Sequence, residues 1–320
     1  MPQVTALGEL LIDFTFEGAN ADGYPVMSAH PGGAPSNFLA ALAKRGVSTA
    51  LITKVGDDAL GRQLKQTVGD IGIDASGVLV DPSYFTTLAF VTLDQNGDRT
   101  FSFARKPGAD TQLTFDEIPL HLIDDCAVFH IGTLSLTDEP SRSATYRAVA
   151  YAKSRGCLIS LDPNLRLPLW PDADHAKREM LWALGQADIV KISEDEVDFL
   201  FGMDERQGAA HILQNFGVSL VFVTLGKNGC FFMNEQGSGY VENYNNVKTV
   251  DTCGAGDIFG GTALYGVLQS GKAPQALTAQ QLHDIADFAC ATASLSTAKH
   301  GGISSVPERD DIVALMAQKR

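Results

Sequence analysis

Short apolar segments alternate with longer segments of helical periodicity along most of the chain. Strands and helices that follow each other in this way predict βαβ units and a mostly parallel sheet flanked by helices, an α/β fold. Glycines end several of the helical segments, as is common at helix C-termini. The expected strands are 4–7, 50–55, 127–131, 158–161, 189–192 and 220–224, and the expected helices are 38–45, 60–68, 142–154, 177–184 and 209–216.

Two stretches depart from this alternation. Segments 88–93 and 99–103 have β character and flank Asn96-Gly97, a dipeptide that favours tight hairpin turns. A second β-like stretch, 14–30, is rich in glycine and alanine. We expect the two stretches to form a small sheet apart from the main one. No linker or low-complexity tract divides the chain, so residues 1–320 are predicted to form a single domain.

The composition argues against several classes of function. The chain carries a net charge of −14, whereas nucleic-acid phosphates are held by clustered Lys and Arg, so no nucleic-acid partner is expected. No apolar run is long enough to predict a membrane span, and the first 18 residues lack the basic region of a targeting peptide. Five cysteines without a CxxC pair indicate reduced thiols and a cytoplasmic protein. Seven histidines without an HExxH motif give no sign of a histidine-held metal.

The strongest chemical signal is the segment 251–257, Asp-Thr-Cys-Gly-Ala-Gly-Asp, followed by an apolar helical run at 258–264. Its glycines let backbone amides approach an anion, and a helix N-terminus adds free N–H groups and a positive dipole end. An acid in the first helical turn, beside a bound phosphate, is placed to take a proton from an attacking hydroxyl. The alternative is that this acid only caps the helix. The residues concerned are Gly254, Ala255, Gly256 and, as the base, Asp257.

A second segment, 31–37, contains Gly32 and Gly33 and opens the helix expected at 38–45. Two glycines permit close backbone approach, and Asn37 offers both a donor and an acceptor to a polyol. The alternative is that Ser36 or Asn37 is a helix N-cap and that the glycines form a loop.

These two segments lie about 220 residues apart, and the pair resembles the signature of the PfkB (ribokinase-like) family of sugar and nucleoside kinases. The resemblance covers essentially the whole chain. Within the family, segments 8–14, 32–37 and 162–170 are most similar to those of bacterial and plant fructokinases, and they are also similar to those of aminoimidazole riboside kinases.

The resemblance implies a Rossmann-like α/β fold with a small β lid, formed by about 14–31 and 86–106. It implies ATP-dependent phosphorylation of D-fructose to fructose 6-phosphate, with Asp257 as base and the amides of Gly254, Ala255 and Gly256 as anion hole. Arg166 matches an arginine that reaches the substrate or the transferring phosphate. Two alternatives stay open: a kinase of another small sugar or riboside (2-keto-3-deoxygluconate, aminoimidazole riboside), and a non-catalytic sugar or nucleotide sensor on the same fold.

The resemblance also implies the remaining site residues, the cofactors and the partners. Mg²⁺ is expected with ATP, and K⁺ near the segment 298–301. The lid edge offers a surface for a homodimer. Glu196 is expected to organise the metal through water, although Ser193-x-x-Glu196 is also a capping box. Sugar contacts are expected from Asp13, Gly32, Gly33, Asn37, Phe101, Phe103 and Arg105, and nucleotide contacts from Lys191, Ser193, Thr224, Gly226, Gly229, Cys290 and Ser294, whereas Lys227 is expected to be a solvated loop lysine.

Overall fold

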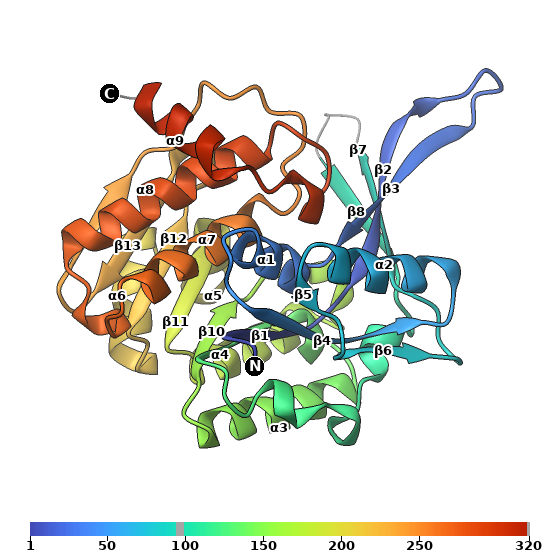
Figure 1. Ribbon diagram of the computed structural model, residues 1–320, viewed down its shortest axis with the longest axis horizontal. Helices are drawn as coiled ribbons and strands as arrows, with labels where there is room; N and C mark the ends of the chain where they lie inside the picture. Colours follow the sequence, from blue (N-terminus) through green and yellow to red (C-terminus); the bar gives the residue numbers. More distant parts are fainter. Residues whose placement is uncertain (94–98, 319–320) are drawn as a thin grey trace.

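A computed structural model of the chain describes residues 1–93 and 99–318 (Figure 1). The side chains of residues 93 and 99–101 also lie outside the description, as does the turn expected at Asn96-Gly97. A ten-stranded sheet runs through the molecule in the order β14-β13-β12-β11-β10-β9-β1-β4-β5, with β6 beside β4. Its strands are β1 (Val4–Leu7), β4 (Thr49–Gly56), β5 (Ile73–Asp74), β6 (Val78–Asp81), β9 (Val128–Gly132), β10 (Leu158–Asp162), β11 (Ile189–Ser193), β12 (Leu220–Thr224), β13 (Cys230–Asn234) and β14 (Gly237–Val241).

The strands from β12 to β5 pair in parallel, and only β13 and β14 add to the sheet in antiparallel fashion. The predicted α/β fold with a mostly parallel sheet is therefore confirmed. Strand β1 lies between β9 and β4, so the order of connection reverses beside it. In open α/β sheets, ligands bind beyond the carboxyl ends of the strands near such a reversal.

Helices cover both faces of the main sheet and give each face its own apolar core. Neighbouring strand residues alternate between the cores: Leu51 belongs to one and Ile52 to the other. On one face lie α1 (Ala34–Ala43), α2 (Ala59–Asp70), α7 (Ala255–Gln269), α8 (Ala279–Ser296) and α9 (Arg309–Gln318), and on the other α3 (Ser141–Ser154), α4 (Ala173–Leu184), α5 (Glu194–Phe201) and α6 (Glu205–Phe216).

A separate four-stranded sheet has the order β3-β2-β7-β8 and projects from one corner of the molecule (Figure 1, upper right). Its strands are β2 (Leu11–Ala19), β3 (Pro25–Gly32), β7 (Leu88–Leu93) and β8 (Arg99–Ala104). Both expected β-like stretches therefore form strands of one small sheet. Strand β2 connects the small sheet to the main sheet, because β2 follows β1 after only three residues.

Three helices begin four residues earlier than the periodicity indicates, and one of them is α4, which starts at Ala173 with Asp172 as its N-cap. Helix α1 starts at Ala34 with Gly33 as its N-cap, so Ser36 and Asn37 lie inside the helix and neither is the N-cap. Helix α6 starts at Glu205, where the Asp204 side chain accepts a hydrogen bond from Gln207 N. In all three cases the first turn consists of polar or small residues, so apolar periodicity does not reveal it. No helix among the described residues is long and apolar enough to cross a membrane.

Candidate active site

A cavity of about 820 Å³ lies at the carboxyl ends of the main strands, between them and the small sheet. We call it the main cavity. Seventeen of the predicted site residues line it, from both halves of the chain. They are Asp13, Gly33, Asn37, Phe103, Arg166, Lys191, Ser193, Glu196, Thr224, Gly226, Gly229, Gly254, Ala255, Gly256, Asp257, Cys290 and Ser294.

The N-terminus of α7 opens into this cavity. Its N-cap, Gly254, has a left-handed backbone with φ of 75°, and a Cβ at this position would lie 2.7 Å from the Cα of Gly302 and 3.0 Å from Asn37 Nδ2. Only glycine fits both the torsion and the space. Helix N-termini present amides without intrahelical partners, and Asp257 stands in this first turn. The turn can therefore hold an anion beside a carboxylate.

Asp257 does not cap the helix; its carboxylate faces α1. Asn37 Nδ2 donates a 2.8 Å hydrogen bond to Asp257 Oδ2 across the cavity floor. Burial raises the pKa of Asp257 to about 7, and the negative charge of Asp162 adds to this, whereas Lys191 and the Asn37 hydrogen bond oppose it. A carboxylate with a pKa near 7 is well matched to accept a proton at neutral pH.

Lys191 lies beneath the same turn of α7. Its Nζ is 3.0 Å from Asp162 Oδ2, and a Cβ at Gly256 would lie 2.9 Å from this Nζ. Burial alone would lower the pKa of Lys191, but the carboxylates of Asp162, Glu196 and Asp257 raise it further than burial lowers it. The ammonium therefore stays charged and brings positive charge to the anion site of an acidic protein.

Asp13 lies at the base of the small sheet and lines the cavity opposite α7. Burial raises its pKa to about 7, the charge of Asp257 contributes in the same direction, and Arg166 opposes both. Gly32 does not line the cavity; it packs against the Asp13 carboxylate, where a Cβ would collide with Asp13 Oδ2. Gly32 thus acts through Asp13, whereas Gly33 reaches the cavity itself.

Glu196 forms the predicted capping box of α5 with Ser193. Its Oε2 accepts hydrogen bonds from Ser193 N and Ser193 Oγ, and its Oε1 accepts one of 2.7 Å from Leu165 N. This carboxylate therefore fixes the loop that carries Arg166. No group of three or more metal-ligating side chains occurs among residues 1–93 and 99–318. Carboxylate oxygens such as those of Glu194, Asp195 and Glu196, which line the cavity, are of the type that suits a magnesium ion together with phosphate oxygens and water.

The loop that precedes α7 is tied to the end of α8. Asp251 is buried; its Oδ2 accepts a 3.0 Å hydrogen bond from Gly301 N, and the Thr297 carbonyl accepts from both Val250 N and Asp251 N. The segment 298–301, expected near a monovalent cation, therefore lies directly beside the anion-binding turn.

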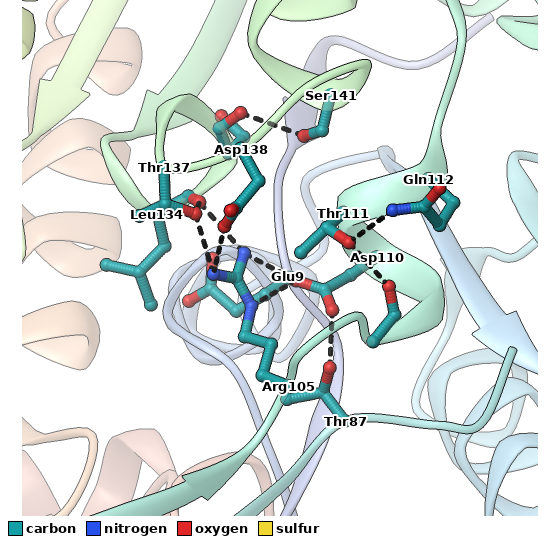
Figure 2. Close-up of polar contacts among 12 residues, drawn as sticks. Glu9, Thr87, Arg105, Asp110, Thr111, Gln112, Leu134, Thr137, Asp138 and Ser141 are labelled. Carbon is teal, nitrogen blue, oxygen red and sulfur yellow. Dashed lines mark hydrogen bonds and ion pairs between the residues drawn. The ribbon is translucent and has the colours of Figure 1, made fainter. Parts of the chain in front are cut away.

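Arg105 is not brought to the cavity. The predicted sugar contact is replaced by a buried ion pair with Asp110, shown in Figure 2, in which Arg105 Nη2 lies 2.7 Å from Asp110 Oδ2. Arg105 follows the last residue of β8, and at this point the chain has already left the small sheet for the core. The side chain of Phe101 lies outside the described residues, while Phe103 lines the cavity.

Among the cavity-lining residues that the sequence did not assign to the site, Glu9 and Asn164 have unusual features. Glu9 is buried, its Oε1 accepts a 2.9 Å hydrogen bond from Ala34 N at the start of α1, and burial raises its pKa to about 7. Asn164 has a left-handed φ of 51°, which is rare for a residue other than glycine and is often found at functional sites. The sequence does contain an indication for Glu9, because this acidic residue lies just beyond the first parallel strand. The Asn164 torsion is invisible in the sequence.

Comparison with known proteins agrees with this geometry. The pfkB family of carbohydrate kinases matches residues 1–309. The chain is 42% identical over 317 residues to fructokinase-1 of Oryza sativa subsp. japonica and 41% identical over 317 residues to fructokinase-1 of Zea mays, and each alignment covers 98% of this chain and 97% of the relative.

Solved structures share the fold over the full length. A fructokinase from Xylella fastidiosa with bound ATP superposes with a TM-score of 0.90 at 26% identity, covering 100% of this chain and 99% of that one. A fructokinase from Vibrio cholerae O395 with bound fructose, ADP and calcium superposes with a TM-score of 0.84 at 31% identity, covering 98% and 99%. A putative ribokinase II from E. coli, in complex with ATP and Mg²⁺, superposes with a TM-score of 0.87 at 28% identity and covers 99% and 100%.

Proposed function

This chain belongs to the pfkB family of carbohydrate kinases and is a sugar kinase, and we propose that it phosphorylates D-fructose to fructose 6-phosphate with ATP. The observation that carries the proposal is the placement of Asp257. It stands in the first turn of α7, beside amides suited to a phosphate, and is hydrogen-bonded to Asn37 within a cavity of about 820 Å³. The identity to plant fructokinases supports fructose as the sugar.

In the proposed reaction, Asp257 takes the proton of the sugar 6-hydroxyl while that oxygen attacks the γ-phosphorus of ATP. The new O–P bond forms as the bond to the β,γ-bridging oxygen breaks, and ADP leaves. Asn37 holds the carboxylate in place through its 2.8 Å hydrogen bond. The amides of Gly254, Ala255 and Gly256, together with Arg166, stabilise the charge on the transferring phosphoryl group.

The two substrates bind against different walls of the main cavity. Asp13, Gly33 and Phe103 line the side next to the small sheet, which suits the sugar hydroxyls and one apolar face. Thr224, Gly226, Gly229, Cys290 and Ser294 line the other side, where we place the nucleotide, with Lys191 and Ser193 nearer the phosphates. The small sheet then acts as the lid, and its closure excludes water as a competing acceptor.

We propose Mg²⁺ as the ion that accompanies ATP, with Glu196 nearest to it through water. When bound, Mg²⁺ neutralises charge on the β- and γ-phosphates. A potassium ion beside 298–301 is proposed because this segment abuts the anion-binding turn, and a double mutant of the Vibrio cholerae fructokinase is described with bound potassium. Rates measured in potassium and in tetramethylammonium chloride at equal ionic strength test it. Equal rates would contradict a potassium requirement.

We further propose a cytoplasmic homodimer that associates through the small sheet. Phe16, Tyr24 and Val26 expose 42%, 68% and 43% of their surface there, and β3 is an edge strand. Sedimentation should give twice the 34.1 kDa chain mass, and Val26→Lys should give the monomer. A monomeric wild type would refute the dimer.

The decisive experiment is a sugar panel in an assay that couples ADP release to a spectroscopic signal, followed by NMR of the product. Fructose should give the highest kcat/KM, and the phosphate should be on the primary 6-hydroxyl. A higher value with 2-keto-3-deoxygluconate or aminoimidazole riboside would reassign the substrate within the family. Tight sugar binding without any ADP release would instead indicate a sensor and would reject the catalytic role of Asp257.

A further inference from the structure

The two ends of the lid hairpin, β7 and β8, meet at one buried carboxylate (Figure 2). Thr87 immediately precedes β7, and its Oγ1 donates a 2.5 Å hydrogen bond to Asp110 Oδ1. Arg105 immediately follows β8, and its Nε donates a 2.8 Å hydrogen bond to Asp110 Oδ2. A single side chain on a short 3₁₀ helix of the core therefore holds both the entry and the exit of the hairpin.

The same arginine reaches the wall of the main cavity. Its Nη1 donates a 2.7 Å hydrogen bond to Thr137 Oγ1, and its Nη2 donates one of 2.9 Å to the Leu134 carbonyl. Leu134 lines the main cavity. In addition, Thr87 accepts a hydrogen bond from Ile12 N through its carbonyl, which joins the start of β2 to the same point. The contacts thus link three lid strands to one wall of the cavity.

The cluster of Thr87, Arg105 and Asp110 is tightly packed. Only 1% of the Arg105 side chain and 3% of the Asp110 side chain are exposed. A Cβ at Gly108 would collide with Thr87 Oγ1 and would lie 3.2 Å from Arg105 Cγ. Buried ion pairs contribute little to stability when compared with apolar replacements of similar volume, because desolvation is costly. We therefore interpret the buried Arg105–Asp110 pair as a device that fixes the geometry of the hairpin ends.

We propose that Asp110 and Arg105 are positioning residues that clamp the hinge of the lid onto the Leu134 wall, so that lid closure and the shape of the sugar side are set together. This proposal rests on the proposed sugar kinase function. Neither residue touches the substrate; both act through the lid strands and through Leu134. The clamp should therefore affect the sugar and the exclusion of water, and should leave the nucleotide side unchanged.

The first test is Asp110→Asn. We expect KM for fructose to rise about tenfold while KM for ATP stays within twofold. We also expect ADP release to exceed sugar phosphorylation, because a loosely held lid admits water. A purely structural role would lower Tm and would move neither the ratio of the two KM values nor the ADP-to-product ratio.

Glu117→Gln is the matched control. Glu117 Oε1 accepts a 2.7 Å hydrogen bond from buried Lys54, so this change also weakens a carboxylate partner of a buried cation, on the next 3₁₀ helix. The Glu117 carboxylate bonds to Lys54 and Thr114, and not to Thr87 or Arg105. We expect a lower Tm, with KM values and an ADP-to-product ratio like those of the wild type. If Glu117→Gln uncouples ADP release as strongly as Asp110→Asn does, the clamp is not specific and the proposal fails.

Should Asp110→Asn fail to fold, Thr87→Val takes its place. It removes one hydroxyl donor at similar volume and leaves Arg105 paired with Asp110. We expect a smaller effect in the same direction, about threefold in KM for fructose. An unchanged KM and an unchanged ADP-to-product ratio in this variant would overturn the proposal.

Hydrogen exchange separates this proposal from the proposed function. In the wild type, fructose should protect amides of β7 and β8; no protection by any sugar would count against the kinase function itself. With sugar-induced protection in the wild type, the clamp predicts that Asp110→Asn or Thr87→Val loses most of it. Equal protection in wild type and variant would leave the kinase in place and reject the clamp.

Discussion

At the scale of single residues, the site depends on a carboxylate that is both buried and close to other carboxylates. Asp257 lies among Asp13, Asp162 and the cation Lys191, and its carboxylate accepts a hydrogen bond from Asn37. Burial makes the charged form costly, so the group binds a proton readily near neutral pH. A group in this state suits general base chemistry better than an exposed aspartate, which holds a proton only weakly.

Asp257→Asn tests this role directly. The amide keeps the size of the side chain but cannot accept the hydroxyl proton, so kcat should fall by about 10²–10⁴. Calorimetry should show fructose affinity within about threefold of the wild type. Asp198→Asn, on the exposed side of α5, is the control and should keep wild-type kcat. Near-wild-type turnover in Asp257→Asn would remove the assignment of the base.

The pH dependence follows from the direction of the same shift. The base must be unprotonated, so kcat/KM should rise with pH up to about 7 and level off above it. Lys191 lowers the pKa of Asp257, so Lys191→Met should shift the rise of kcat/KM to higher pH. Lys227→Met changes an exposed lysine at the cavity rim and should leave this rise where it is. If kcat/KM rises over the same pH range in the wild type, Lys191→Met and Lys227→Met, then Lys191 does not act on Asp257.

At the scale of elements, the N-terminus of α7 depends on a backbone that only glycine adopts easily. Gly254→Ala places a methyl group against Gly302 and Asn37 at a φ of 75°. We expect kcat to fall at least tenfold and KM for ATP to rise, because the turn must shift. Gly217→Ala is the control: it has almost the same φ, 74°, at the end of α6, with no atom within 4 Å of the added Cβ.

Both glycine variants should lose about 1–2 kcal/mol from the left-handed torsion. Only Gly254→Ala should lose activity, as measured by steady-state kinetics beside thermal unfolding. If Gly217→Ala lost as much activity, the loss would follow from stability and not from the anion-binding turn.

The elements also show what the sequence can reveal. Apolar periodicity located β1, β12 and the hairpin strands β7 and β8 to within one residue, because each strand has one consistent apolar pattern. It did not reveal α8, whose residues pack on several neighbours and include many polar side chains. The family resemblance gave Asn37 as a sugar contact and Asp257 as the base, but the hydrogen bond between these two residues, 220 positions apart, was not predicted. The ion pair of Arg105 could not be predicted, because it depends on where the chain leaves β8.

At the scale of the whole molecule, three buried acids oppose folding at high pH. Burial raises the pKa values of Glu9, Asp13 and Asp257 to about 7 each, well above those of exposed carboxyl groups. Between pH 4 and 7 the folded protein keeps protons on these groups that the unfolded chain has lost. The free energy of unfolding should therefore decrease as pH rises through this range and change little above it.

Single substitutions separate this effect from the general repulsion of a chain with net charge −14. Glu9→Gln keeps an oxygen for Ala34 N but cannot ionise, so its Tm should exceed that of the wild type by a margin that grows from pH 4 to 7 and then stays constant. Asp257→Asn should behave in the same way, whereas exposed Asp198→Asn should show no such growth. A pH-independent margin for both buried acids would mean that they are not held protonated. A growing margin in the inactive Asp257→Asn would show that the burial that prepares the base for proton transfer also makes the folded protein less stable.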